Sequence, residues 1–153
     1  MTLAEYRRYY RDLTLGVLGG NHAHFDITMP DDTAKKTEYD NYRRGLTVLA
    51  LVSLAESNLI AEGDFKALRK FEPSTGVPSI VNQTHLSGFI YLRDCVAHNP
   101  ATTLLSGGKN TAAFVSAVAS GQFPFATVSG SALSIGNTHE LHLIVLRLYG
   151  ENV

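Results

Sequence analysis

Residues 89–100 read FIYLRDCVAHNP, and this stretch predicts how the chain folds. On a helix of 3.6 residues per turn, its apolar residues and those just before it fall within one arc of about 120°. The stripe comprises Leu86, Phe89, Ile90, Val96 and Ala97. Pro100 should end the helix, because the residue before a proline is pushed out of the α region. We therefore expect a core helix that begins near Thr84 and ends at His98.

Arg93 lies near the centre of this apolar stripe. A buried guanidinium is costly unless an anion meets it. The sequence leaves two explanations open. Arg93 pairs with a carboxylate of its own chain, such as Glu56, which is the only acid in the apolar run of a preceding helix, or it meets a ligand from outside.

The flanking segments also predict helices. Thr2 and Glu5 form a capping box for a first helix that ends at the glycine pair 19–20. A long helix is expected over 33–62, closed by Gly63, with its apolar half 46–60 as the central core helix.

Shorter elements follow in the rest of the chain. Asp64 is expected to cap a short helix through Phe71, and further helices are expected at 112–120 and 141–149. Asn137 with Glu140 suggests a capping box for the last of these. Residues 123–136 are compatible with a loop or a short β-hairpin. The sequence thus predicts a mainly all-α fold, a helical bundle in one domain spanning 1–153.

Composition narrows the functional class. The net charge of -1 gives no overall attraction to nucleic acid, so any such binding must come from local groups. One cysteine, Cys95, allows no internal disulfide and fits a reducing, cytoplasmic compartment. The apolar run 45–55 is shorter than the roughly 18 residues that a membrane span requires, so we expect a soluble protein that contacts no membrane.

Arg93, Asp94 and His98 form the pattern R-D-x3-H at the end of the apolar helix. Such a pattern, with Asp, Asn or His after the arginine, is expected about 0.04 times by chance in this composition. It resembles the signature of HEPN-domain ribonucleases, which have Arg, a polar residue, and His four to six positions after the Arg. Many members have Asn where this chain has Asp94.

The resemblance implies a HEPN-like helical bundle and a homodimer in which two copies of the motif face each other. It also implies metal-independent endoribonuclease activity without a cofactor. Its biological setting would be defence, as a toxin of a toxin–antitoxin pair or a related effector, and a cognate antitoxin or inhibitor protein would then be a partner.

The chemistry agrees with this expectation. An imidazole such as His98 is suited to proton transfer at neutral pH, a guanidinium such as that of Arg93 matches phosphate oxygens, and Asp94 is placed to orient His98. Arg93 and His98 point about 140° apart on a regular helix. Two copies of the chain would therefore have to share one cleft.

Other residues are candidates for RNA binding. Arginines alternate with tyrosines in YRRYYR and YDNYRR, a mixture that can hold phosphates and stack bases. The candidates are Arg7, Arg8, Arg11, Arg43 and Arg44, with Asn99 beside the motif. An ordinary solvated helix face explains the same pattern.

Two groups of histidines resemble parts of a metal site: His22, His24 and Asp26 in one loop, and His139 with His142 one helical turn apart. Neither is a complete ligand set, and we predict no metal.

The alternative to the enzyme is a non-catalytic HEPN-like module that binds RNA or a nucleotide, or that dimerises.

Overall fold

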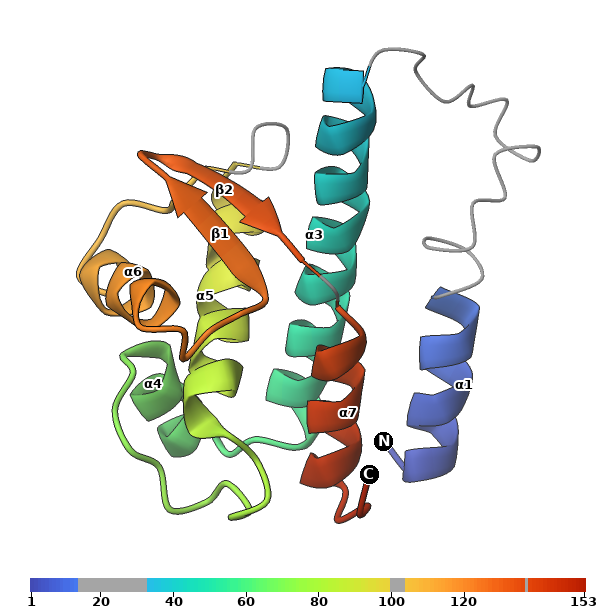
Figure 1. The fold of residues 1–153 in the computed structure, drawn as a ribbon. Coiled ribbons are helices and arrows are strands. Elements are labelled where there is room, and N and C mark those ends of the chain that lie inside the picture. The colour runs from blue at the N-terminus through green and yellow to red at the C-terminus, as the bar shows by residue number, and fades with distance from the viewer. Residues whose placement is uncertain (14–32, 100–103, 137) are drawn as a thin grey trace.

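The computed structural model describes residues 1–13, 33–99, 104–136 and 138–153. The chain is mainly helical with one short antiparallel hairpin, which confirms the predicted fold class (Figure 1). The elements are α1 (Leu3–Leu13), α3 (Thr33–Asn58), α4 (Glu62–Arg69), α5 (Gln83–His98), α6 (Thr111–Ala119), β1 (Ala126–Ser129), β2 (Ala132–Ile135) and α7 (His139–Leu148). Among the described residues, no helix is long and apolar enough to cross a membrane.

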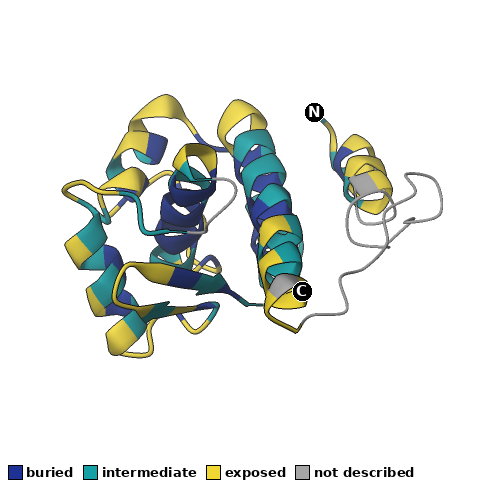
Figure 2. Cartoon of the chain, turned by 90° about the horizontal axis from the view of Figure 1, so that it is seen from above, coloured by how far each residue is buried: buried dark blue, intermediate teal, exposed yellow. Residues whose placement is uncertain are grey.

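Helix α5 is the centre of the bundle. It packs against α3, α4, α6 and α7, and most of its surface is buried (Figure 2). The predicted stripe is confirmed at Leu86, Phe89, Ile90 and Val96, whereas Ala97 is exposed. Helix α3, expected to be the central core helix, buries one face only. Its buried residues in the apolar half are Thr47, Val48, Leu51, Val52 and Ala55.

The helix ends agree with the sequence in part. Thr2 and Glu5 form the predicted capping box, with reciprocal bonds of 2.7 Å and 3.2 Å. The helix α5 starts one residue before Thr84, because the Asn82 side chain accepts a bond from the His85 N–H. It ends at His98 as expected.

Two predicted boundaries are wrong. Helix α3 ends at Asn58, where the N–H groups of residues 59 and 60 both donate to the Ala55 carbonyl. Gly63 therefore does not close α3 and lies inside α4. Asp64 does not cap α4. Its carboxylate instead accepts bonds from Ser74 and Gly76, and thereby ties the loop after α4 to that helix.

The hairpin resolves the alternative that the sequence left open for residues 123–136. Strands β1 and β2 pair from Ala126↔Ile135 to Ser129↔Ala132, and Gly130 turns the chain with φ 60°. Buried side chains of β2 hold the hairpin on the bundle, where β2 meets α3 and β1 meets α6. Of the capping box predicted for α7, Asn137 lies outside the described residues.

Gly88 allows the hairpin side of the bundle to approach α5 closely. A Cβ at this position would lie 2.3 Å from the ring of Phe123, which is fully buried. At Gly63, by contrast, a Cβ would meet nothing within 4 Å.

We expect Gly88→Ala to lower the free energy of unfolding by up to about 2 kcal/mol. Overpacking costs about 1–3 kcal/mol, and the gain in helix propensity offsets about 1 kcal/mol of it. The matched control Gly63→Ala should raise the free energy of unfolding by up to about 1 kcal/mol. Chemical denaturation of both variants tests this, and equal effects would contradict the close approach.

Candidate functional site

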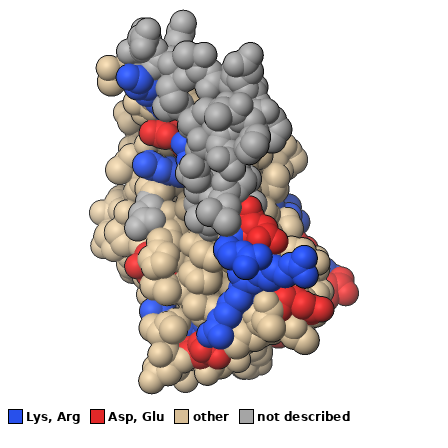
Figure 3. Space-filling view, turned by 90° about the vertical axis from the view of Figure 1, so that its right-hand side faces the viewer, with Lys and Arg blue, Asp and Glu red and all other residues tan. Residues whose placement is uncertain are grey.

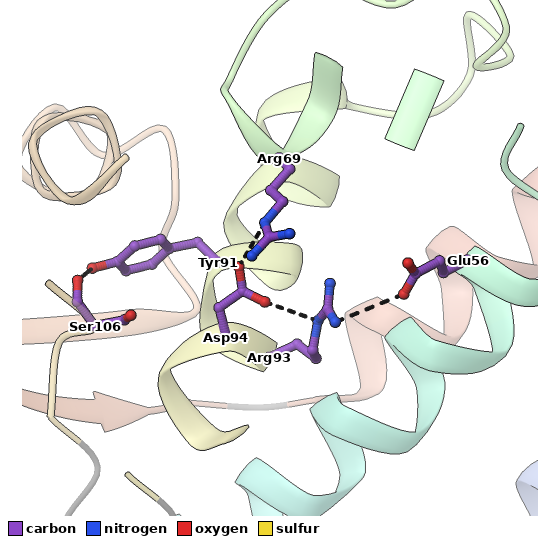
Figure 4. A network of polar contacts seen from close by, with 6 residues as sticks. All are labelled: Glu56, Arg69, Tyr91, Arg93, Asp94 and Ser106. Carbon is purple, nitrogen blue, oxygen red and sulfur yellow. Dashed lines mark hydrogen bonds and ion pairs between the residues drawn. The ribbon is translucent and has the colours of Figure 1, made fainter. Parts of the chain in front are cut away.

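Arg93 is held by carboxylates of its own chain. One terminal nitrogen, Nη1, lies 3.7 Å from Oε2 of Glu56, and Nε lies 3.1 Å from Oδ1 of Asp94 (Figure 4). The guanidinium also lies over the ring of Phe65, 5.3 Å from its centroid. Of the two explanations for this arginine, the internal carboxylate is the one that the structure bears out.

The guanidinium of Arg93 is largely closed to solvent. Its side chain is 17% exposed, and Nε and Nη2 are buried without a hydrogen bond to any described group. The 3.1 Å distance from Nε to Asp94 is therefore an ion pair whose hydrogen-bond angles are poor. Charge, rather than directed hydrogen bonds, holds Arg93 in place, and Arg93 in this position is not available to a ligand.

Asp94 lies between two arginines. Its Oδ2 accepts a 3.1 Å bond from Nε of Arg69, at the end of α4, while Oδ1 faces Arg93 (Figure 4). The Asp94 side chain is 13% exposed and that of Arg69 is 52% exposed. The network that runs from Glu56 through Arg93 and Asp94 to Arg69 thus joins α3, α5 and α4.

A polar pocket of about 220 Å³ opens where α5 ends. It is lined by Arg69, Tyr91, Asp94 and His98, and by the turn 106–110, which includes Lys109. His98 and Lys109 are exposed. The pocket therefore brings two residues of the predicted motif together with two cations that sequence reasoning missed.

The side of the pocket formed by the turn is fixed to α5. The Tyr91 hydroxyl donates a 2.7 Å bond to the Ser106 carbonyl, and the Ser106 N–H donates to the sulfur of Cys95. Burial raises the pKa of Tyr91 to about 12 and also raises the pKa of the Cys95 thiol. Neither group is therefore prepared to exchange protons at neutral pH, and we assign both a structural role.

None of the other predicted RNA-binding residues lines this pocket. On α1, Arg7 pairs with Glu151, and Arg8 and Arg11 pair with Asp12, so basic and acidic groups alternate on this face (Figure 3). An ordinary solvated helix face accounts for these contacts.

The remaining candidates are also engaged within the chain. Arg44 donates to the Ile135 carbonyl, and Arg43 lies near Asp40 and over the Tyr39 ring. Asn99 caps α5 by donating its N–H to the Cys95 carbonyl.

The two groups of histidines do not form a metal site in the described part of the chain. No cluster of three possible ligands occurs there, and the loop with His22, His24 and Asp26 lies outside the described residues. His142 stacks on Tyr10 with ring centroids 3.6 Å apart, and its Nδ1 is 2.7 Å from the Tyr6 hydroxyl. This histidine connects α7 to α1.

Comparison of the chain with protein-family models, with curated proteins and with solved structures finds no match. The likeness to HEPN-domain ribonucleases thus depends on the R-D-x3-H motif.

We expect Asp94→Asn to lower the free energy of unfolding by about 1–3 kcal/mol, because Arg93 stays buried after losing its nearest anion. The control Asp12→Asn removes a carboxylate that also meets two arginines but is 51% exposed, and should change stability by less than about 0.5 kcal/mol. Denaturant titration measures both. Equal losses would show that the network contributes no more than a surface pair.

The contact between α1 and α7 should weaken in acid. Burial, then the charges of His139 and Arg7, lowers the pKa of His142 from 6.5 to about 4. The unfolded chain therefore takes up the proton first, so stability is full above about pH 6.5 and falls as the pH drops towards about 4. His142→Phe keeps a stacked ring and should show a flatter pH dependence of melting temperature. The same slope in both proteins would contradict this role for His142.

Proposed function

We propose that the protein is a metal-independent endoribonuclease whose proton-transfer residue is His98. The observation that carries the proposal is the exposure of His98 at a polar pocket that also contains Asp94 and two cationic side chains. The R-D-x3-H motif of Arg93, Asp94 and His98 points in the same direction.

The reaction needs few groups. A base removes the proton of the ribose 2′-hydroxyl, and the 2′-oxygen attacks the adjacent phosphorus. The bond from phosphorus to the 5′-oxygen then breaks, and an acid protonates that oxygen. The products are a 2′,3′-cyclic phosphate and a 5′-hydroxyl. Positive charge must meet the phosphorane oxygens as their charge grows.

Arg93 has a different role in this proposal from the phosphate contact that its sequence position suggests. Its guanidinium is committed to Glu56 and Asp94. It would therefore act as a positioning residue, which holds the Asp94 carboxylate at the side of the pocket. Asp94 in turn would orient the imidazole of His98.

A homodimer would complete the site. His98 is the only histidine among the described residues that line the pocket, and the reaction requires both a base and an acid. A second copy could supply the other imidazole across a two-fold axis. RNA cleavage in defence, restrained by a cognate antitoxin or inhibitor, is the biological setting that the resemblance implies.

A second candidate function is a non-catalytic module that binds RNA or a nucleotide. The internal pairing of Arg93 favours it, since the arginine of the motif is then structural. The presence of one histidine in the pocket of one chain also favours it.

Incubation of the purified protein with RNA in EDTA tests the proposal. We expect cleavage that leaves cyclic phosphate ends and that falls at least about 100-fold in His98→Ala, the usual effect of losing a general acid–base. The control His139→Ala removes an exposed histidine outside the pocket and should retain activity. A folded wild-type protein that never cleaves, or equal rates in both variants, would contradict the enzyme.

A further inference from the structure

We propose that Arg69 and Lys109 bind the phosphate of the RNA strand in this pocket, in place of Arg93. This inference rests on the proposed function and assigns the phosphate contacts that it leaves open. It concerns two residues that lie outside the motif and come from different parts of the chain, the end of α4 and the turn before α6.

Both cations have donors to offer. Arg69 donates through Nε to Asp94, and its terminal nitrogens form no hydrogen bond or ion pair within the described residues. Lys109 is exposed and has no ion pair or hydrogen bond with any described group. A guanidinium and an ammonium beside one pocket are the usual donors to phosphate oxygens.

The carboxylate in the pocket does not cancel this charge. Both oxygens of Asp94 face arginines: Oδ1 faces Arg93, and Oδ2 faces Arg69. Glu56 and Asp94 carry two negative charges. Arg69, Arg93 and Lys109 carry three positive charges, so one positive charge is uncompensated on the side where Lys109 is exposed. The buried Arg93 thereby contributes to the pocket without touching its contents.

The size of the pocket selects the part of the RNA that enters it. At about 220 Å³ it is smaller than the ~300–1,000 Å³ of pockets that enclose a whole small molecule. Gly107 and Gly108 of its lining are exposed, and a Cβ on either would meet nothing within 4 Å, so described residues do not cover the pocket beside them. A phosphodiester group fits this space with the flanking nucleotides outside, as an RNA strand requires.

Binding of a single-stranded 2′-O-methyl RNA oligonucleotide tests the assignment, because the blocked 2′-oxygen prevents cleavage. We expect Lys109→Gln and Arg69→Gln each to weaken binding about 5- to 10-fold. Each should also make the slope of log K against log salt shallower by about 0.7, the value for one lost phosphate contact on a single strand. Arg69→Lys keeps the charge and should retain the slope.

The matched control is Lys66→Gln, which removes an exposed cation of α4 that pairs with Glu62. It should leave the affinity and the slope unchanged. Lys109 is the decisive position, because its side chain has no hydrogen bond or ion pair with a described residue and its replacement leaves the Asp94 network intact.

The outcomes separate this inference from the proposed function. If the protein cleaves unmodified RNA, but neither substitution changes the binding affinity or the salt slope, the inference is overturned and the proposed function is not. Binding that depends on Arg69 and Lys109 without cleavage would support it and favour the binding module. A wild-type protein that neither binds nor cleaves would overturn both. Inorganic phosphate as a competitor should displace the strand if the phosphate alone is recognised.

Discussion

The ion pair between Arg93 and Asp94 is the constraint on which the site depends. A largely buried guanidinium on the central helix has to be met by negative charge, and Glu56 and Asp94 supply it from two helices. Asp94 is thereby held where Arg69 of a third helix reaches it. This largely buried charge thus links α3, α4 and α5 through one network, and it holds the carboxylate of the pocket.

In the folded chain, Arg93 of the R-D-x3-H motif lies in a different environment from Asp94 and His98. Arg93 faces the interior, whereas Asp94 and His98 lie on the pocket beside the turn 106–110. Their separation follows from helix geometry, since residues four apart share a face and Arg93 lies one position away from it. The cations available to a phosphate are then the ones that the tertiary fold brings, Arg69 and Lys109.

The features that could be predicted from the sequence are those that depend on residues close together in the chain. The stripe of α5, its end before Pro100 and the capping box at Thr2 were visible in the sequence because each depends on neighbours a few residues away. The end of α3 was not, because the chain reverses at Asn58 without a glycine. Arg69 could not be found either, since its contact with Asp94 joins residues 25 positions apart and no spacing marks such a pair. The sequence named Glu56 as an anion for Arg93, but it could not choose between that anion and a ligand.

A crystal structure with a bound 2′-O-methyl RNA strand tests the central claim most directly, namely that Arg93 serves the site through Asp94 and does not bind RNA itself. The account predicts a phosphate within hydrogen-bonding distance of Arg69, Lys109 and His98, with Arg93 still paired to Glu56 and Asp94. A phosphate bound by Arg93, with Glu56 released into solvent, would contradict it.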